Sequence, residues 1–451
     1  MQAKNKGGIL RNPLIGASAI ILFALLITLI GINIPFEKNQ DVSRINAGDT
    51  AWVAAAAVLV MLITPALGFF YGGLVRRKNL LSILAQSIAM FAVVSVVWAL
   101  WGYSLAFGPS IGGIVGDLSH IFMKGIGYAP EAVYAATIPA LLFFFFQLKF
   151  AAITPVLIIG AFAERIKFKS LIVFTVLWST IIYAPLAHWV WGNGGWLRGL
   201  GALDFAGGTV VHIAAGFSAL AAAIVIGHRN GKVRGESHEP NNIPYVILGA
   251  ALLWFGWFGF NGGSALAANG IAINALVVTN IAAAFAALSW MAYDWITKGK
   301  PTATGIAIGA VCGLVAITPS SGFVDATAAM AIGIIAGLVS NVVASWRAER
   351  KVFDDTLDVF ACHGISGVWG ALATGIFAQL AINSAGANGL LYGNPNLIAA
   401  QVIAVLAAAL WSFGGSFVLM KAIDKTIGLR VTAKEEEKGL DVSQHGERAY
   451  S

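Results

Sequence analysis

Two acid–histidine pairs lie inside apolar stretches of the sequence. The first pair is Asp204 and His212, in Asp-Phe-Ala-Gly-Gly-Thr-Val-Val-His, and the second is Asp358 and His363, in Asp-Val-Phe-Ala-Cys-His. Ionisable groups are costly within a lipid bilayer, and where they occur they usually mark a pathway or a site. A neutral imidazole offers one hydrogen-bond donor and one acceptor. Two of them can therefore pass a hydrogen bond or a proton along a path that is otherwise lined by carbon.

Two other uses of these histidines have to be weighed. A single histidine within a membrane also fits a structural role as a hydrogen-bonded core residue. A metal site would need further ligands, and no Cys or Glu supplies an evident third one. Cys362 adjoins His363, but neighbouring residues on a helix point about 100° apart, which disfavours joint ligation. Cys312 and Cys362 are the only cysteines in the sequence, and we predict no disulfide framework, no metal and no other cofactor.

Aromatic residues are dense in stretches that could serve the same pathway. Phe146 and Phe150 are four residues apart and so share one face of a helix, as do Phe260 and Ser264. Trp191 ends another apolar run. Lipid contact explains many aromatic residues of membrane proteins. An aromatic wall with one hydroxyl group is, however, also suited to a small cation, which ring quadrupoles attract.

The composition places these residues in a membrane protein. Of the 451 residues, 58% are hydrophobic and 11% are charged, whereas charged residues make up about a quarter of soluble domains. A helix of about 20 apolar residues crosses a bilayer. The predicted fold class is an all-α polytopic membrane protein. We predict eleven transmembrane helices, at 50–75, 80–108, 130–162, 170–191, 206–227, 244–268, 272–296, 302–318, 326–345, 356–381 and 396–421.

The net charge is +7, and the placement of the basic residues along the chain indicates the topology. Four basic residues occupy one set of connecting loops, namely Lys38, Arg44, Lys124 and Arg198. The alternate set of loops is much richer and holds Arg76, Arg77, Lys78, Arg165, Lys167, Lys169, Arg229, Lys232, Arg234, Lys298, Lys300, Arg347, Arg350 and Lys351. Cytoplasmic loops carry such an excess. We predict a multi-pass protein of the plasma membrane with a cytoplasmic C-terminus, and no nucleic-acid partner.

The predicted spans divide into five, five and one. Because each half has an odd number of spans, the second half enters the membrane from the opposite side, which makes the halves inverted repeats. Such repeats place their binding path near the midplane, at the repeat interface. His212 lies on the fifth span of the first half and His363 on the fifth span of the second, so we predict that they face each other across a narrow pathway. Glycines spaced four apart predict close packing of two helices, namely Gly305, Gly309 and Gly313, with Gly333 and Gly337.

Three segments follow from these boundaries. Residues 1–48 form an N-terminal extension, whose apolar run 14–34 is either a signal peptide or an extra helix, and both interpretations stay open. Residues 49–422 form the transmembrane domain, and Asp49 is expected to cap its first helix. Residues 423–451 form a cytoplasmic tail.

Three charged residues lie within or beside the predicted spans. Asp204, at the start of its helix, is expected to act as an N-cap or as a fixed negative charge that favours cations, and both roles stay open. Asp358, near the inner end of the tenth span, is expected to be structural. Lys149, inside the third span, is expected to snorkel or to pair at a subunit contact.

These motifs resemble the ammonium transporter family (Amt/Mep/Rh), specifically its Amt branch. The matching phrases are Phe-Phe-Tyr-Gly-Gly-Leu-Val-Arg-Arg-Lys-Asn (69–79), Gly-Ala-Phe-Ala-Glu-Arg (160–165), Ala-His-Trp-Val-Trp-Gly (187–192), Asp-Phe-Ala-Gly-Gly-Thr-Val-Val-His (204–212), Trp-Phe-Gly-Phe-Asn-Gly-Gly-Ser (257–264), His-Gly (363–364) and Gly-Leu-Asp-Val-Ser-Gln-His-Gly-Glu-Arg-Ala-Tyr (439–450). The resemblance extends from about residue 49 to the end of the chain. Residues 1–48 lie outside it.

The resemblance implies an eleven-helix subunit of a homotrimer, with one pore in each subunit. Asp204 matches the acid that shapes the outer vestibule in this family. The inner loops, notably 228–243, and the tail resemble the surface that PII-type regulators plug. By match to the family motifs, the pathway from outside to inside consists of Trp191, Phe146 and Ser264 as the outer ammonium site, Phe150 and Phe260 as a stacked gate, and His212 and His363 as twin imidazoles.

The hypothesis that follows is an ammonium transporter that binds the cation outside, removes a proton near the gate and passes ammonia to the histidines. Potassium cannot lose a proton, and a bare cation in hydrocarbon is costly. An ammonium sensor with little net flux is the alternative, and we expect it to need a further cytoplasmic domain. An intramembrane enzyme using His212 and Asp204 would need a nucleophile, and the best candidate, Ser264, lies outside the imidazoles. We therefore predict that the chain is not an enzyme.

Overall fold

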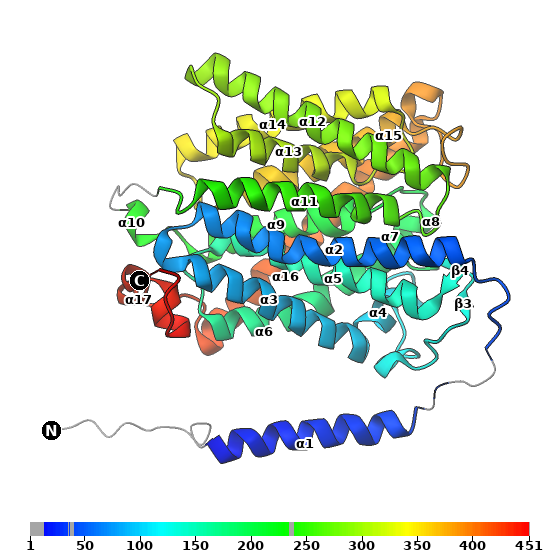
Figure 1. Cartoon of the computed structure of the whole chain (residues 1–451), viewed down its shortest axis with the longest axis horizontal. Coiled ribbons are helices and arrows are strands. Elements are labelled where there is room, and N and C mark those ends of the chain that lie inside the picture. Colours follow the sequence, from blue (N-terminus) through cyan, green and yellow to red (C-terminus); the bar gives the residue numbers. More distant parts are fainter. Residues whose placement is uncertain (1–12, 35, 37–39, 234–238, 451) are drawn as a thin grey trace.

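Helices make up nearly the whole molecule, as the composition predicts (Figure 1). The structure is a computed structural model and describes residues 13–34, 36, 40–233 and 239–450. Within these residues, ten helical segments are long and apolar enough to cross a bilayer. The predicted span at 302–318 corresponds to a shorter helix, Ala303–Ile317, of 15 residues. The run 14–34 also forms a helix, Pro13–Ile32.

The elements are as follows in chain order. Before residue 240 the helices are α1 (Pro13–Ile32), α2 (Ala47–Leu74), α3 (Leu80–Val97), α4 (Tyr103–Phe107), α5 (Ala140–Phe162), α6 (Phe168–Trp178), α7 (Ala184–Trp191), α8 (Trp196–Gly199), α9 (Ala214–Ile226) and α10 (Asn230–Val233). After it they are α11 (Ile243–Gly263), α12 (Gly270–Lys298), α13 (Ala303–Ile317), α14 (Ala326–Arg350), α15 (Ser366–Phe377), α16 (Pro395–Ile427) and α17 (Ala433–Lys438). Short 3₁₀ turns are η2 (Arg77–Asn79), η4 (Ile121–Met123) and η8 (Leu390–Tyr392).

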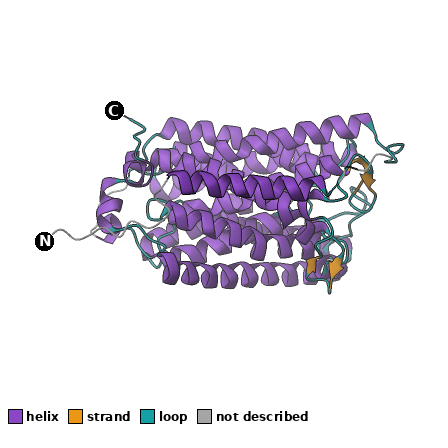
Figure 2. Ribbon diagram, turned by 90° about the horizontal axis from the view of Figure 1, so that it is seen from below, coloured by secondary structure: helices purple, strands orange, loops and turns teal. Residues whose placement is uncertain are grey.

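The long helices lie side by side, and the strands are confined to one end of the bundle (Figures 1 and 2). Two small antiparallel hairpins form there, β1 (Ser110–Ile111) with β2 (Val115–Gly116), and β3 (Pro130–Glu131) with β4 (Ala135–Pro139). The third span was predicted to begin at residue 130. That boundary is wrong, because residues 130–139 form the second hairpin and the helix α5 begins only at Ala140. The C-terminal elements lie at the opposite end, which we call the basic end because it carries Arg76, Arg165, Arg229 and Arg347.

The N-terminus of α2 is capped one residue before its start. Asn46, rather than the predicted Asp49, is the N-cap, and its side-chain oxygen accepts from the Asp49 amide. Asp49 lies in the first turn, where a negative charge is favourable. Its carboxylate accepts a hydrogen bond from the Ala268 amide at 2.8 Å. Asp49 therefore ties the start of α2 to the loop between α11 and α12 instead of capping its own helix.

Glycines let neighbouring helices approach closely, as their spacing predicts. A Cβ atom added at Gly313 would lie 2.4 Å from the Ala282 carbonyl oxygen, and one added at Gly333 would lie 2.3 Å from the same oxygen. Both distances are shorter than any real contact of a Cβ atom. The glycines of α13 and α14 thus pack against the backbone of α12, which small residues make possible in membranes.

A crossing that leaves no room for a side chain joins the two segments that carry the predicted histidines. A Cβ atom added at Gly216, on α9, would lie 2.1 Å from the Gly364 nitrogen and 2.2 Å from its Cα. Gly364 belongs to η7 (Phe360–Ile365), a π-helical turn. The rings of Phe217 and Phe360 meet edge-on beside this crossing, 5.4 Å apart. Backbone therefore touches backbone close to the middle of the bundle.

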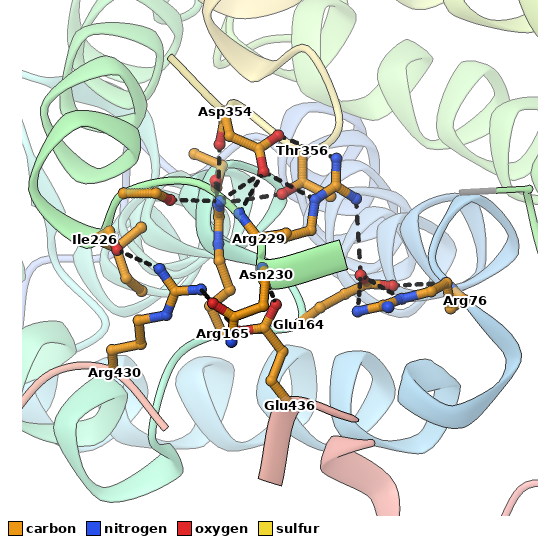
Figure 3. Close-up of polar contacts among 12 residues, drawn as sticks. Arg76, Glu164, Arg165, Ile226, Arg229, Asn230, Asp354, Thr356, Arg430 and Glu436 are labelled. Carbon is orange, nitrogen blue, oxygen red and sulfur yellow. Dashed lines mark hydrogen bonds and ion pairs between the residues drawn. The ribbon is translucent and has the colours of Figure 1, made fainter. Parts of the chain in front are cut away.

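A buried network of charges holds the basic end together (Figure 3). Asp354 Oδ2 lies 3.0 Å from Arg165 Nη1 and 2.9 Å from Arg229 Nε. Glu164 Oε2 lies 2.8 Å from Arg76 Nη2 and 3.7 Å from Arg229 Nη1. Burial by itself raises the pKa of Asp354, but the Arg165 and Arg229 guanidinium groups outweigh it and hold this pKa far below its usual range. The network links the ends of α2, α5 and α9 at the basic end to the segment after α14.

The tail after α16 joins this network. Glu436, on α17, accepts a hydrogen bond from the Asn230 amide at 2.7 Å and lies 2.7 Å from Arg430 Nη2. Arg430 in turn donates to the Ile226 carbonyl oxygen at the end of α9. Thr432 and Glu435 form a capping box that fixes the start of α17. The tail is thus folded onto the bundle at the end of the helix that follows His212.

Substitution of Gly216 by Ala tests the backbone crossing. We expect Gly216→Ala to lower the free energy of unfolding by about 1–3 kcal/mol, because the added methyl group overpacks Gly364. The measurement is chemical denaturation of the purified protein in detergent. Gly414→Ala on α16 is the matched control, since an added Cβ meets nothing there within 4 Å, and helix propensity favours Ala by about 1 kcal/mol. Equal stability of the two variants would contradict the crossing.

Substitution of the adjacent acids Asp354 and Asp355 tests the network. We expect Asp354→Asn to cost about 3 kcal/mol at pH 7, because Arg165 and Arg229 lose their buried partner. Since the folded-state pKa of Asp354 is lowered, its contribution is complete above the unfolded pKa of about 4 and is lost as the pH falls below it. The difference in the free energy of unfolding between Asp354→Asn and wild type should therefore persist from pH 7 to about pH 5 and become smaller below about pH 4.

Asp355→Asn is the matched control and should behave in the opposite way. Burial raises the pKa of Asp355 to about 6, so its ionised form weakens the fold at higher pH. At pH 8 the Asn variant should be at least as stable as wild type. As the pH falls through about 6, the free energy of unfolding of wild type should rise relative to that of the variant. A similar loss for both variants at pH 8 would argue against the network as described.

Candidate functional site

The two predicted histidines meet inside the bundle. His212 Nδ1 lies 3.3 Å from His363 Nδ1. The ring centroids are 5.4 Å apart and the planes differ by 19°. Both residues are almost completely buried, with 1% and 2% of their surface exposed. The predicted approach of the two imidazoles from separate halves of the chain is thus what the structure has.

Each histidine lies in a π-helical turn. His212 belongs to η6 (Gly208–Ile213), which continues into α9, and His363 belongs to η7, which continues into α15. Such turns add a residue to a helical turn and are frequent at functional sites. Further π-helical turns in the described chain are η3 (Trp98–Gly102), η5 (Ser179–Tyr183) and η9 (Asp441–His445). The sequence does not reveal these turns, because nothing in their local composition distinguishes them from ordinary helix.

The contact between the rings constrains their hydrogens. One Nδ1 must carry a proton and the other must accept a hydrogen bond from it. In the ring with the protonated Nδ1, Nε2 is therefore an acceptor, and in the other ring Nε2 carries the proton and is a donor. His212 Nε2 is buried and has no hydrogen-bond partner among the described residues. A buried polar atom without a partner is unfavourable unless something else satisfies it. This nitrogen is therefore available to a small solute.

A continuous column of rings leads from His212 toward the end with the hairpins. His212 stacks on Trp257 at 5.3 Å and on Phe260 at 5.9 Å between centroids. Phe260 lies 4.4 Å from Phe150, and Phe150 lies 6.1 Å from Trp191. These residues come from α5, α7, α11 and η6, so only the tertiary fold brings them into line.

The column ends in a cavity of about 220 Å³ at the end with the hairpins. Trp191 and Ser264 line it, as predicted from the family motifs, and so does Phe150. The remaining lining residues are Phe107, Val133, Tyr134, Phe143, Gln147, Val190, Arg198, Phe205 and Leu266. Phe146, also predicted for the outer site, is not among these lining residues. Its ring is fully buried and packs edge-on against Phe150 at 4.9 Å.

Polar groups in this cavity are oriented to accept hydrogen bonds. The Ser264 hydroxyl donates to the Phe260 carbonyl oxygen at 2.8 Å, so its own lone pairs remain free. Gln147 Oε1 is buried and has no partner within the described part of the chain. Gln147 was not among the site residues predicted from the sequence. The signal was its polarity within a phenylalanine-rich run.

Trp191 is held in a fixed orientation. Its indole nitrogen donates to the Asp204 carbonyl oxygen at 2.9 Å. Arg198 donates to the Trp191 carbonyl oxygen at 2.8 Å, so a guanidinium group also lies at this cavity. Tyr134, which the sequence did not single out, accepts from the Asn193 amide and donates to Phe107. The aromatic wall is therefore rigid.

The Asp204 side chain binds backbone amides at the start of η6 and is not among the residues that line the cavity. Its two carboxylate oxygens accept hydrogen bonds from the amides of Gly207, Gly208, Thr209 and Val210, at 2.7 to 3.2 Å. Burial raises the pKa of Asp204, and these amide donors oppose the rise. Of the two predicted roles, the structure supports the cap. Four donors fix the turn that presents His212.

The other singled-out residues lie off this column. Asp358 pairs with Arg347 at 2.7 Å, which fits the predicted structural role. Lys149 Nζ lies 3.6 Å from the centroid of the Phe145 ring, so an aromatic face satisfies this cation. Cys312 and Cys362 are free thiols whose sulfur atoms lie 3.2 Å apart. Among the described residues, no group of three or more His, Cys, Asp or Glu is placed to hold a metal ion.

Comparison with known proteins agrees with this geometry. The model of the Ammonium Transporter Family matches residues 51–450. The chain is 50% identical over 404 residues to ammonium transporter Amt1 of Archaeoglobus fulgidus, which covers 90% of this chain and 99% of that protein. It is 48% identical to an ammonium transporter of Bacillus subtilis, over 89% of this chain and 98% of the relative.

Solved structures share the fold. The crystal structure of Saccharomyces cerevisiae Mep2 has a TM-score of 0.81 and 35% identity, over 86% of this chain and 91% of that one. A structure titled Sensor Amt Protein has a TM-score of 0.81 and 34% identity, over 88% and 98%. With the paired histidines, the ring column and these relatives together, the chain is a member of the ammonium transporter family.

Proposed function

We propose that this transporter captures ammonium in the cavity beside Trp191, removes one proton at the phenylalanine pair and passes ammonia to His212 and His363. The observation that carries the proposal is the unbroken column of rings between the cavity and a buried imidazole nitrogen without a partner. Its parts come from distant segments and fit one solute path. The chemistry is transport, and no step changes the substrate permanently.

Capture relies on rings and lone pairs. The Trp191 and Phe150 faces attract a small cation, worth about 0.5–2 kcal/mol for each good contact. Ser264 Oγ and Gln147 Oε1 are the acceptors for ammonium N–H groups. We assign the outer site to Trp191, Phe150 and Ser264, with Phe146 supporting the Phe150 ring from behind. Potassium has no N–H groups to donate, so these acceptors favour ammonium.

Deprotonation is required below the cavity. Phe150 and Phe260, 4.4 Å apart, close the way with carbon on both sides. A bare cation in such surroundings costs several kcal/mol, whereas ammonia is neutral. Ammonium can lose its proton at this boundary and potassium cannot. The proton is proposed to travel separately, and the imidazole pair is its candidate route.

The histidine pair guides the neutral solute. Ammonia donates through its N–H groups and accepts through one lone pair, so it can bind His212 Nε2 in either tautomer. Because the two Nδ1 atoms share one proton, a change of tautomer in one ring must be matched in the other. The pair is thus suited to relay a hydrogen bond, or a proton, from one side to the other.

The orientation and partners follow from the same proposal. We place the basic end in the cytoplasm, because cytoplasmic loops carry an excess of Lys and Arg. The capture cavity then faces outward across the plasma membrane, residues 49–422 form the transmembrane unit and residues 423–451 a cytoplasmic tail. By family likeness we propose a homotrimer and a PII-type regulator that binds the basic end. The helix α1 is an additional segment beside the bundle.

An ammonium sensor is the second candidate, and the likeness to the structure titled Sensor Amt Protein favours it. Substrate-dependent charge movement across proteoliposomes that contain the purified protein separates the two. Sustained ammonium-dependent current or uptake supports the transporter. Ammonium binding without sustained flux would support the sensor instead.

Replacement of either imidazole tests the relay. We expect His212→Asp and His363→Asp to weaken discrimination against potassium by about tenfold or more, because a carboxylate stabilises a cation where carbon and neutral rings do not. The measurement is the ratio of ammonium to potassium current in proteoliposomes. His228→Asn, outside the column, is the control and should keep the wild-type ratio. Unchanged selectivity in both Asp variants would refute the relay.

Replacement of Trp191 tests the capture site. We expect Trp191→Leu to raise the ammonium concentration for half-maximal current about twofold to thirtyfold, because one ring contact is worth about 0.5–2 kcal/mol. Trp196→Leu is the matched control, because Trp196 lies nearby but outside the cavity lining. The same shift in both variants would show that the effect is not local to the cavity.

A further inference from the structure

A second cavity, of about 460 Å³, opens at the basic end, away from the ring column. It lies between the loop that joins α2 to α3 and the C-terminal tail. Its lining is unusually rich in cations and consists of Arg76, Arg77, Lys78, Lys438, Asp441, Val442, Arg448, Ala449 and Tyr450. Nothing in the transport pathway uses these residues.

Some of this charge is already balanced. Arg76 pairs with Glu164 at 2.8 Å, and Lys78 donates to the Glu437 carbonyl oxygen. Asp441 is the only acid among the described residues of the lining, and its Oδ1 accepts from the Ser82 amide at 2.8 Å. Its second oxygen, Oδ2, is buried and has no hydrogen-bond partner in the described chain.

Three cations remain without an acid. The Arg77 guanidinium lies over the Tyr450 ring at 4.5 Å, which leaves its N–H groups free at the ring edge. Lys438 and Arg448 are exposed on the tail, and no ion pair joins them to another described residue. The like charges of Arg77, Lys438 and Arg448 repel each other, and no acid among the described residues pairs with them to offset this repulsion.

The walls of the cavity are held in place by the backbone. The Leu440 amide donates to Asn79 Oδ1 at 2.8 Å, next to the Asp441–Ser82 hydrogen bond. Gly439 has φ +97°, and a Cβ atom there would lie 2.6 Å from the Lys78 carbonyl oxygen. The tail therefore passes tightly against the loop, and the backbone that carries the cations on both sides is fixed before any ligand binds. Such preorganisation lowers the cost of binding.

We propose that a phosphate-bearing anion binds between Arg77, Lys438 and Arg448 and joins the tail to the α2–α3 loop. A phosphate group offers several acceptor oxygens and matches the planar donors of Arg, while Lys serves as a point charge. The volume lies within the range of small-ligand sites, about 300–1,000 Å³. Since Arg77 begins a membrane span, the phosphate can belong to an anionic lipid headgroup or to a soluble phosphate ester.

The experiment compares both sources on the purified full-length protein. Inorganic phosphate and glycerol 3-phosphate are titrated in detergent at constant ionic strength, with chloride as the reference anion. Nanodiscs of phosphatidylcholine, with and without phosphatidylglycerol, provide the lipid arm. The readouts are thermal stability and hydrogen exchange of residues 433–450. We expect either source to raise stability and to slow exchange in the tail.

The double variant Lys438→Gln/Arg448→Gln provides the specific test. These side chains have no ion-pair partner in the described structure, so their loss should leave the fold intact. We expect the double variant to weaken the response at least about tenfold, which corresponds to about 1.4 kcal/mol. Lys425→Gln/Lys434→Gln removes the same charge from exposed positions outside the cavity, and it should respond like wild type.

The outcomes are distinct. A response to the soluble phosphates that the cavity variant loses supports a soluble ligand, and a response confined to phosphatidylglycerol supports a lipid headgroup. The proposal is overturned if neither source changes the tail, or if the cavity variant and the control variant respond equally. None of these results depends on ammonium flux.

Discussion

The contact of backbone with backbone at Gly216 and Gly364 is the constraint on which the pathway depends. It brings η6 with α9, and η7 with α15, closer than any pair of side chains would permit. At this separation the imidazoles of His212 and His363 are within 3.3 Å of each other. Gly367 extends the same close face, because a Cβ atom there would lie 3.2 Å from the His212 Cβ. In a membrane, where hydrophobic burial between helices contributes little, such close packing is a principal source of stability.

The π-helical turns beside the glycine crossing need hydrogen-bond partners of their own. A π turn leaves some backbone groups without their usual partners, and inside a bilayer each such group must be satisfied within the protein. Asp204 meets this demand at the start of η6 with four accepted hydrogen bonds. Asp355 does so at η7, where its Oδ2 accepts from the Phe360 amide at 2.7 Å. Two acids that precede the histidines, Asp204 and Asp355, are therefore explained by the irregular backbone that presents each imidazole, whereas Asp358 pairs with Arg347.

Charge and carbon are kept apart along the molecule. The column from Trp191 to His363 consists of rings and small residues, whereas the ion pairs of Arg165, Glu164 and Asp354 are gathered at the basic end (Figure 3). This separation keeps fixed charge away from the rings between the cavity and the histidines, while buried pairs lock the helix ends at the basic end. Breaking one such pair is costly because it strands its partner. The tail is held at the same end of the molecule by the ion pair of Glu436 with Arg430.

The sequence by itself determined the class of fold, the positions of nearly all the spans and the identity of the paired histidines. It could do so because lipid imposes a length of about 20 apolar residues on each helix, and because a polar residue within such a run is exceptional. The motifs also indicated Trp191, Ser264, Phe150 and Phe260. Only the tertiary structure decided that Phe146 lies behind Phe150, that Asp204 caps a helix, that residues 130–139 form a hairpin and that both histidines lie in π turns. Those features depend on contacts between segments far apart in the chain, such as Gly216 with Gly364, which no local pattern of residues specifies.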